Sequence, residues 1–397
     1  MKFCLITKNR FFIDENYFIS SGWLGYEDLG LLGFKFNEFE KLIFIGFKED
    51  MPFDGYKYNF GSKNGIFIVG SKWREEKRYV LDRLNNILNT LKEIWKNRKI
   101  LKDVDLVFAP FFEYVVFEFL LLKIICKKAK LIVHLITDYP EWNYRKRKNL
   151  FIKYLLLFSL KLTQFISNEN WILSKFLYQK YKNKKSIIVP TSSLRDYQIG
   201  ISKFLPKEKI NLIFVGRLEG EKQPHIPVLI VKNLIIKNQR NNFYLNIVGN
   251  GSLKNKLEEL VIENNLKDNV NFWGWIKERD VLFEIYKQSD IFLLTSNMGE
   301  GLGWVILEAM SQGLPILSTK CGGPEEIIED GKNGFLIEIK DENYIVDKFV
   351  EKIEYLINNS QVYEEISKNN IEKAKDWTAE KFFAIMRKNI LELLNNE

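Results

Sequence analysis

The sequence predicts an α/β fold of two doubly wound domains, and two observations lead to this prediction. Short runs that are apolar on both faces alternate with helical patterns, as in a parallel sheet that helices cover on both sides. The alternation breaks once, near the middle of the chain, and then starts again. At 397 residues the chain is long enough for two domains that each bury their own core.

The first half of the chain contains strand-like runs with helical patterns between them. The runs are rich in aliphatic and aromatic residues, which favours buried strands. The predicted strands are 2–7, 41–47, 65–70, 105–109, 130–136, 165–168 and 186–190. The predicted helices are 72–98, 112–127 and 149–163.

The second half repeats this organisation. Its predicted strands are 210–215, 242–248, 270–273, 291–294, 316–318 and 334–337. Its predicted helices are 228–237, 252–264, 278–288, 304–311 and 341–358. Residues 191–209 hold Pro206 and few periodic apolar residues, so we expect the hinge there. The predicted domains are therefore 1–195 and 196–376, followed by a last segment, 377–397.

Composition indicates a soluble globular protein, with 46% hydrophobic and 28% charged residues. The three cysteines, Cys4, Cys126 and Cys321, are scattered, which predicts neither a disulfide framework nor a zinc site and favours a reducing compartment. No signal peptide is visible, and no apolar run approaches the roughly 18 residues that a spanning helix needs. We therefore expect a cytoplasmic protein that can contact the inner face of the membrane.

The net charge of +8 is concentrated in residues 141–185. This segment holds eleven Lys or Arg residues against two acids, with aromatic residues interleaved. One interpretation is a solvated basic face on helices whose aromatic residues are core. The other is a surface for anionic lipid or for a lipid-linked diphosphate. We find no nucleic-acid motif and expect no nucleic-acid partner.

The most informative stretch is 290–334. A predicted strand is followed by a glycine-rich turn, a helix and a second short strand. The turn glycines let backbone N–H groups approach a ligand where the helix begins, which is a geometry that holds anions. Two carboxylates, Glu300 and Glu308, bracket the turn and the helix. Because Glu308 lies among apolar residues, it must either face solvent or meet a polar partner.

These motifs resemble the nucleotide-sugar site of family 4 retaining glycosyltransferases. The Glu-x7-Glu element from Glu300 to Glu308 is followed by Gly-Leu-Pro at 313–315 and by Gly-Gly-Pro at 322–324. The resemblance implies the GT-B fold, in which two Rossmann-like domains face each other across a cleft. It also implies that the first domain binds the acceptor and the second binds the nucleotide sugar. In such proteins the final helix, here within 377–397, crosses back onto the first domain.

The resemblance assigns roles to the donor site in the second domain. Arg217 and Lys222 match the diphosphate clamp of the family. The arginine guanidinium is a rigid fork of hydrogen-bond donors and the lysine ammonium is a mobile point charge, and together they suit a diphosphate. The alternative is an exposed basic loop. By resemblance, Glu300 contacts the donor sugar and Glu308 accepts the ribose hydroxyls. The amides of Gly301, Leu302 and Gly303 complete the predicted anion site.

Two strand ends with glycine turns are candidates for framing the nucleobase. Gly249 and Gly251 follow one predicted strand, and Trp275 and Ile276 follow the next. Ligands of open α/β sheets bind at such carboxyl ends, although a glycine turn after a strand is often only a turn. The resemblance places Trp275 and Ile276 beside the base.

A hydrolase pair of Glu300 and Glu308 is disfavoured. Such carboxyl groups stand roughly 5 to 9.5 Å apart. Eight residues of mostly helical chain separate the two backbones by roughly 10 Å and rotate them off a common face.

Acceptor-side residues are predicted in the first domain. Gly22 lies in a loop that loosely matches the family's glycine-rich loop, although it can equally be a helix N-cap region. The segment 131–140 resembles the family's strand that ends in a His-Asp pair, but Thr137 occupies the His position and His134 lies upstream, where a core role is expected. Asp138 is therefore the preferred acceptor-site candidate.

Two further polar groups are weighed and assigned no catalytic role. His225, near the phosphate loop, is expected to have a surface role. Asp103 and Asp105 match the metal-binding pair of another glycosyltransferase fold but precede a strand, so we predict no metal.

The motifs and the resemblance together predict a glycosyltransferase, and the resemblance implies that it retains the anomeric configuration. Its donor would be a UDP- or GDP-linked sugar, with no other cofactor, and its acceptor a hydroxyl of a glycan or a polyprenyl-linked carrier in surface polysaccharide assembly. Two alternatives stay open, a sugar-nucleotide epimerase of the same fold and a non-catalytic sugar-nucleotide sensor. The shortage of histidines argues against the epimerase.

Overall fold

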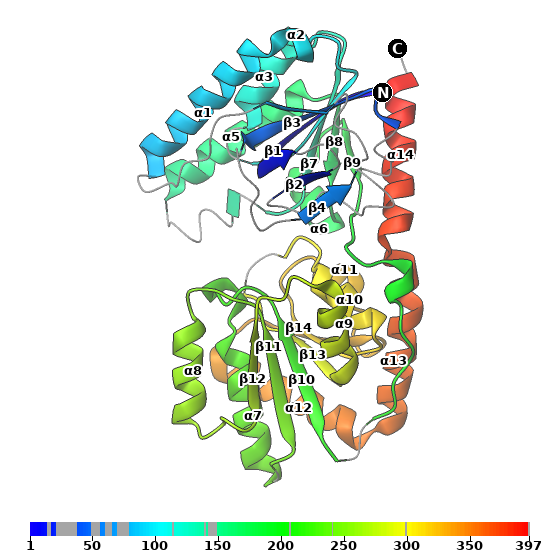
Figure 1. Ribbon diagram of the computed structural model, residues 1–397. Helices are drawn as coiled ribbons and strands as arrows, with labels where there is room; N and C mark the ends of the chain where they lie inside the picture. The colour runs from blue at the N-terminus through cyan, green and yellow to red at the C-terminus, as the bar shows by residue number, and fades with distance from the viewer. Residues whose placement is uncertain are drawn as a thin grey trace. The chain divides into compact units, whose positions relative to one another are not determined.

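The chain forms two compact units in the computed structural model (Figure 1). The first unit combines Met1–Pro190 with Phe382–Glu397, and the second is Thr191–Lys381. The residues that the structure describes are 1–13, 17–20, 38–48, 56–59, 66–69, 79–112, 115–138, 140–141, 149–205, 208–239, 241–297 and 300–395. Among the described helices, none combines the length and the apolar character that crossing a bilayer requires.

The first unit is built on a nine-stranded sheet. Its path is β4-β2-β1-β6-β7-β8-β9, with β3 paired to β1 and β5 paired to β3. The strands are β1 (Lys2–Ile13), β2 (Tyr17–Ser20), β3 (Lys41–Lys48), β4 (Tyr56–Asn59), β5 (Ile66–Val69), β6 (Leu106–Pro110), β7 (Lys130–Leu135), β8 (Glu169–Ile172) and β9 (Ser186–Ile188). Most neighbours are parallel, as predicted. Strands β2 and β4 are antiparallel additions that the sequence prediction missed.

Helices pack against this sheet. They are α1 (Tyr79–Lys96), α2 (Arg98–Leu101), α3 (Val115–Ile125), α5 (Leu150–Ile166), α6 (Lys175–Tyr181) and most of α14 (Ala379–Asn395). Helix α3 packs against both α1 and α5. Helix α5 begins where the Asn149 side chain accepts a hydrogen bond from the Ile152 amide at 3.1 Å, as N-cap residues do.

The predicted strand at 165–168 is wrong. Helix α5 continues to Ile166, and the next strand begins only at Glu169. The helix extends because Leu160, Thr163 and Gln164 continue its buried stripe at helical spacing. It ends at Ser167, whose amide and hydroxyl both donate to the Thr163 carbonyl, at 3.0 and 2.7 Å.

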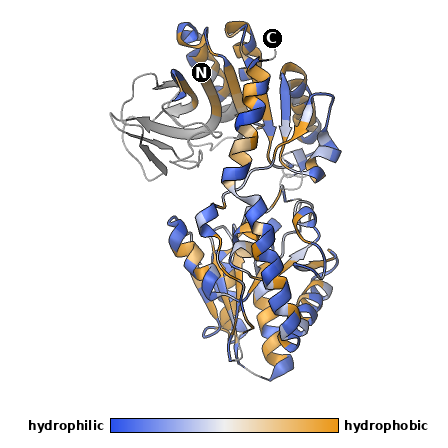
Figure 2. Cartoon of the chain, turned by 90° about the vertical axis from the view of Figure 1, so that its right-hand side faces the viewer, coloured by the Kyte–Doolittle hydropathy of each residue, from blue (hydrophilic) through white to orange (hydrophobic). Residues whose placement is uncertain are grey.

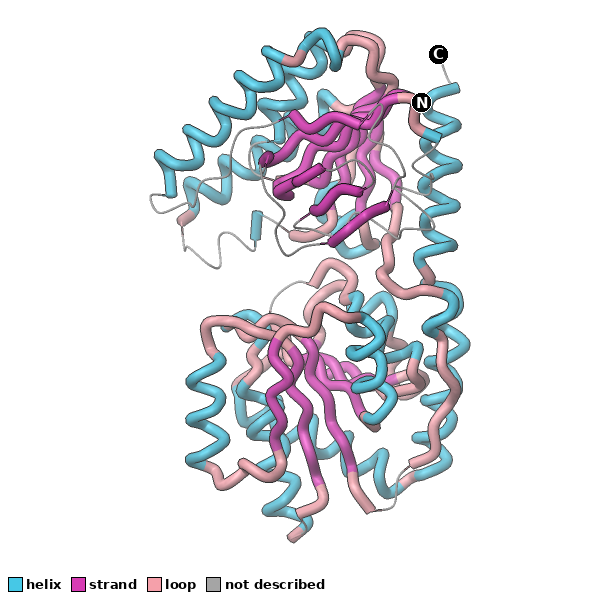
Figure 3. Tube along the Cα trace, viewed as in Figure 1, coloured by secondary structure: helices cyan, strands magenta, loops and turns pink. Residues whose placement is uncertain are grey.

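The second unit contains a parallel six-stranded sheet in the order β12-β11-β10-β13-β14-β15 (Figure 3). The strands are β10 (Ile210–Val215), β11 (Phe243–Val248), β12 (Val270–Gly274), β13 (Ile291–Leu294), β14 (Ile316–Thr319) and β15 (Gly334–Ile337). The helices are α7 (His225–Asn238), α8 (Lys254–Glu263), α9 (Arg279–Gln288), α10 (Trp304–Ser311), α11 (Pro324–Ile327), α12 (Glu342–Asn358) and α13 (Ser360–Ala374).

The core of the second unit lies between this sheet and its helices. Strand β13 is buried at every position, and α7 and α12 pack on each other and enclose apolar residues from both. Along the helices in Figure 2, hydrophobic and hydrophilic residues alternate, as expected of amphipathic helices. Each aliphatic side chain buried in this way stabilises the fold by about 1.5 to 3 kcal/mol.

The strand order places a topological switch point between β10 and β13. From β10 the chain moves outward through β11 to β12, and it then returns to lay β13 on the other side of β10. The chain therefore leaves β10 and β13 in opposite directions, through the loops that follow them, and the carboxyl ends of such strands are where open α/β sheets bind ligands. The residues with predicted donor roles lie in and around these loops.

Candidate functional site in the second unit

An ion pair joins the two loops at the switch point. Lys222 lies in the turn Gly220–Lys222 after β10, and its ammonium contacts the Glu300 carboxylate. The Ser296 hydroxyl donates to the same carboxylate oxygen, Oε1, at 2.7 Å. The Thr295 hydroxyl donates to the Lys222 carbonyl at 2.9 Å, which fixes one backbone against the other. The predicted clamp lysine and the predicted sugar-binding carboxylate are therefore direct neighbours.

Arg217 occupies the other end of the loop after β10. Its Nη2 lies 2.5 Å from Glu221 Oε1, and its side chain is 55% exposed. The Asn297 amide donates to the Glu221 carbonyl at 3.0 Å, so the partner of Arg217 is itself held to the loop after β13. The guanidinium is thus positioned by a carboxylate and keeps much of its surface open to a ligand.

Glycines bring the next two loops together at the start of α10. The Gly323 amide donates to the Glu300 carbonyl at 3.0 Å, and a Cβ on Gly323 would lie 2.5 Å from the Gly301 carbonyl oxygen. Gly303 is the N-cap of α10 and has a φ of 87°, which a side chain would disfavour. Leu302 between them is buried. The first amides of α10 can therefore receive an anion.

The loops after β10 and β11 interlock through Gly249 and Gly251. The Leu218 amide donates to the Asn250 carbonyl, and the Leu253 amide donates to the Leu218 carbonyl, each at 3.0 Å. A Cβ on Gly249, whose φ is 137°, would lie 1.9 Å from the Gly216 carbonyl oxygen. These glycines are therefore required by the close approach of the backbones.

Trp275 and Ile276 follow β12, which is an edge strand of the six-stranded sheet. Strand β12 ends at Gly274, and the Trp275 side chain after it is exposed, while Ile276 is partly buried. The Gly249 amide donates to the Gly274 carbonyl at 2.8 Å, so this strand end adjoins the glycine loop after β11.

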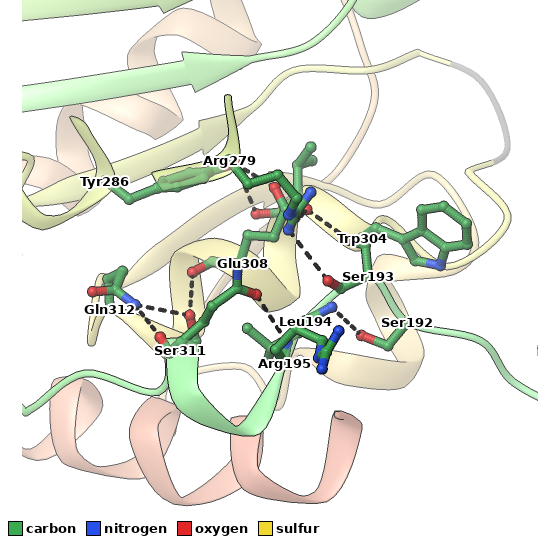
Figure 4. A network of polar contacts seen from close by, with 12 residues as sticks. Ser192, Ser193, Leu194, Arg195, Arg279, Tyr286, Trp304, Glu308, Ser311 and Gln312 are labelled. Atoms are coloured by element: carbon green, nitrogen blue, oxygen red, sulfur yellow. Dashed lines mark hydrogen bonds and ion pairs between the residues drawn. The ribbon is translucent and has the colours of Figure 1, made fainter. Parts of the chain in front are cut away.

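Glu308 is the centre of a buried polar network (Figure 4). Ser193 Oγ donates to Glu308 Oε1 at 2.7 Å, and Arg279 Nη2 donates to the same oxygen at 3.0 Å. The Tyr286 hydroxyl donates to Oε2 at 3.2 Å. Burial, together with this carboxylate, raises the pKa of Tyr286 well above its usual range. The sequence required solvent or a polar partner for Glu308, and the structure supplies three polar partners.

The same network fixes helix α10 to the segment that begins the second unit. Trp304 Nε1 donates to the Thr191 carbonyl at 2.8 Å, and Gln312 Nε2 donates to the Gln198 carbonyl at 2.6 Å. Both ends of α10 are thus anchored to the residues that follow Pro190. Sequence reasoning missed Ser193, Arg279 and Tyr286, because each is a single polar residue without a motif.

The cysteine nearest the site is not a nucleophile. The Cys321 carbonyl accepts a hydrogen bond from the Glu300 amide at 2.8 Å, so the residue adjoins the predicted sugar contact. Burial, and next the Glu300 charge, raise the pKa of the Cys321 thiol to about 12. The thiol is therefore protonated at neutral pH.

The predicted acceptor residue, Asp138, lies in the first unit, where protein groups surround it. The carboxylate follows β7 and is buried. Lys180 Nζ and the Tyr181 hydroxyl donate to its two oxygens, each at 2.5 Å. Both partners belong to α6, so Asp138 holds that helix to the end of β7. Burial, and next this carboxylate, raise the pKa of Tyr181.

Further residues singled out from the sequence are two histidines, a threonine and a glycine. His134 is buried in β7 with Nε2 3.1 Å from the Val189 carbonyl oxygen, and burial lowers its pKa to about 4. Thr137 is exposed. His225 Nε2 lies 3.0 Å from Glu342 Oε2. Gly22 falls outside the residues that the structure describes.

Comparison with known proteins identifies the family. The family model of glycosyl transferases group 1 matches residues 200–373, a range that includes Arg217, Lys222, Glu300 and Glu308. An uncharacterised glycosyltransferase of Methanocaldococcus jannaschii is 30% identical over 284 residues, which cover 62% of this chain and 67% of that protein. The chain belongs to the group 1 glycosyl transferases.

Other relatives of this group 1 glycosyl transferase carry more specific names. The UDP-Gal:alpha-D-GlcNAc-diphosphoundecaprenol alpha-1,3-galactosyltransferase of Escherichia coli is 31% identical over 252 residues, covering 60% of this chain and 62% of that protein. Spore coat protein SA of Bacillus subtilis is 30% identical over 189 residues, covering 45% of this chain and 48% of that protein. The chain spans about half the length of most of the curated relatives that it matches.

Solved structures show the same fold. Anabaena Alr3699/HepE in complex with UDP has a TM-score of 0.68 at 15% identity, and the match covers 100% of both chains. TarM has a TM-score of 0.60 at 19% identity, covering 89% of this chain and 66% of that one. The predicted GT-B fold is confirmed for this group 1 glycosyl transferase.

Proposed function

We propose that this chain transfers a sugar from a nucleoside diphosphate sugar to a hydroxyl of a glycan or a lipid-linked acceptor, with retention of configuration. One observation carries the proposal. Arg217, Lys222, Glu300 and the first amides of α10 lie in the segments that follow the carboxyl ends of β10 and β13, with a buried acid, Glu308, in α10. We further propose a cytoplasmic role in surface polysaccharide or glycoconjugate assembly.

In this proposal the donor diphosphate binds between the loops after β10 and β13. The guanidinium of Arg217, the ammonium of Lys222 and the α10 amides are hydrogen-bond donors that stabilise the charge developing on the departing phosphate oxygen. That oxygen can accept the proton of the acceptor hydroxyl on the same face of the sugar. Retention then needs no nucleophile from the protein, which fits the protonated Cys321.

The choice of donor and acceptor class rests on relatives. The Escherichia coli relative is named for UDP-Gal and for a diphosphoundecaprenol acceptor. Anabaena HepE has been crystallised with UDP and with UDP-glucose. These names favour a UDP-linked sugar over a GDP-linked one, and a polyprenyl-linked acceptor. On the acceptor side, Asp138 stays our candidate, and its contacts indicate that it would act by positioning α6.

Substitution of the two cations tests the diphosphate assignment. We expect Arg217→Ala and Lys222→Ala each to lower turnover by roughly 10² to 10³, the typical loss for one such donor. Lys254→Ala, which removes an exposed cation of α8, is the matched control and should have little effect. Near-normal turnover in both site variants would contradict the assignment.

A thermal-shift screen of UDP-, GDP- and ADP-sugars should precede the kinetics, because it identifies the donor. Products formed without an acceptor then separate the alternatives. An epimerised sugar would indicate an epimerase. Donor binding without transfer to any lipid or glycan acceptor would indicate a sensor.

A further inference from the structure

Helix α5 of the first unit exposes a row of aromatic side chains. Its outward residues Phe151, Phe158 and Phe165 are 75%, 65% and 76% exposed. Its buried face combines leucines with the polar residues Ser159, Thr163 and Gln164. A surface helix normally buries its apolar stripe and exposes its polar one. An outward row of aromatic rings therefore indicates that something else covers this helix.

Hydrogen bonds satisfy the buried polar side chains of α5. The Thr163 hydroxyl donates within the helix to the Ser159 carbonyl at 2.7 Å, and Gln164 Nε2 donates to the Tyr181 carbonyl of α6 at 3.0 Å. Because buried polar groups without partners are costly, these bonds allow this side of the helix to be buried, and the second bond ties it to α6. The aromatic residues lie on the exposed side.

The neighbouring helices also expose large apolar residues. Helix α3 exposes Phe117 and Ile124, and α1 exposes Trp95. Helix α3 packs against both α1 and α5, so the three helices lie side by side in Figure 1. We call Trp95, Phe117, Ile124, Phe151, Phe158 and Phe165 the outer apolar face. Several exposed apolar residues on adjacent helices favour an interaction site.

A lysine-lined cavity adjoins the end of this face. It has a volume of about 470 Å³, and its apolar wall is formed by α5, including Phe165. Among the residues that the structure describes, its lining includes five lysines and no acid: Lys161, Lys180, Lys182, Lys184 and Lys185.

Three of these lysines are available to an external anion. Lys180 pairs with Asp138, and Lys185 Nζ donates to the carbonyls of Phe165 and Ser167. Within the described part of the chain, no ion pair joins Lys161, Lys182 or Lys184 to a carboxylate, and the Lys182 ammonium lies 5.5 Å from the centre of the Tyr178 ring. The cavity therefore combines ammonium groups that no carboxylate neutralises with an apolar wall, which suits a phosphate that is attached to a hydrocarbon chain.

We propose that the outer apolar face and the lysine cavity bind the surface of an anionic lipid bilayer. The aromatic rings enter the boundary between head groups and acyl chains, and the lysines contact lipid phosphates. The helices lie in the interface and do not cross the membrane. A second copy of this chain is a poor occupant, because it would bring lysines of the same sign against these lysines. This inference does not depend on the proposed transferase activity.

Vesicle flotation of the full chain tests this surface. We expect the protein to float with vesicles of phosphatidylcholine and phosphatidylglycerol and to stay below vesicles of phosphatidylcholine alone. Two double variants, Phe151→Asp with Phe158→Asp and Lys161→Glu with Lys184→Glu, should each weaken binding by at least about tenfold. The matched controls lie in the second unit: Ile236→Asp with Ile262→Asp, and Lys256→Glu with Lys267→Glu. These residues are also exposed, and both control variants should bind as the unchanged chain does.

Several results would overturn the proposal. One is equal flotation with neutral vesicles, and another is undiminished binding by the Phe151/Phe158 variant. Release by inorganic phosphate at constant ionic strength would show that the cavity binds free phosphate. Self-association that the same variant abolishes, without vesicle binding, would identify a second copy as the occupant. A thermal shift with UDP, measured on every variant, reports separately on the donor site.

Discussion

At the scale of single residues, Glu308 has two roles to reconcile: the family motif assigns it to a ligand, and it is also the centre of a hydrogen-bond network within the protein. The resemblance assigns this acid to the ribose hydroxyls, whereas in the structure Ser193, Arg279 and Tyr286 donate hydrogen bonds to its oxygens. A ribose hydroxyl would therefore have to replace or join a protein donor. The carboxylate itself was predictable from the motif. Its partners were not, because they come from distant parts of the chain and only folding brings them to it.

Two variants separate the structural and ligand-binding roles of this acid. Glu308→Ala should weaken the affinity for free UDP and GDP. It should also lower the free energy of unfolding by about 2 to 3 kcal/mol, because it leaves the partly exposed Arg279 without its carboxylate partner. Ser193→Ala removes one protein donor but keeps the acid, so nucleotide affinity should be retained. Titration calorimetry measures both affinities. Unchanged affinity in Glu308→Ala would remove the ribose role.

At the scale of elements, the second unit was the more predictable part. The bounds of β10, β13, β15 and α10 agree with the predicted ranges, because each element is a compact apolar run between turn residues. Helix α13 was missed because its buried face includes Ser367 and Asn370, which weaken the apolar period. These residues bond instead to the backbone of Lys203 and Leu314, at 2.7 Å each, and such pairing cannot be deduced from local sequence.

The interlocked loops yield a prediction about Gly249. Gly249→Ala should lower the free energy of unfolding by at least about 2 kcal/mol and abolish nucleotide binding, because its Cβ would collide with the Gly216 carbonyl at an unfavourable φ. Gly220→Ala lies in a neighbouring turn, where a Cβ meets no atom within 4 Å, and should be tolerated. Denaturant unfolding and the UDP thermal shift provide the measurements. Equal behaviour of the two variants would show that the loops rearrange freely.

At the scale of the whole molecule, each unit has its own core, and the buried His134 gives the first unit a pH dependence of its own. Burial lowers the folded-state pKa of His134 to about 4, below the ordinary 6.5, so the unfolded chain binds the proton more readily. The stabilisation that comes from keeping His134 neutral is fully present above pH 6.5, and it is lost as the pH falls toward 4. It amounts to about 3 kcal/mol, from a shift of about 2.5 in pKa.

Thermal unfolding between pH 7.5 and pH 4.5 measures this effect. The transition of the first unit should move to lower temperature as the pH falls, and His134→Gln should reduce that dependence. UDP should shift only the transition of the second unit, which identifies the two transitions. A pH dependence that is identical in the variant would assign the effect to other groups.

The contact between Lys222 and Glu300 bears on turnover in the proposed reaction. The ammonium contacts a carboxylate of its own chain, so a donor diphosphate would have to displace that carboxylate in order to pair with this cation. When the nucleoside diphosphate product leaves, the same carboxylate would be close enough to contact the ammonium again. Under the proposed function the chain therefore carries an internal competitor for its product, which would weaken product binding and favour the next cycle.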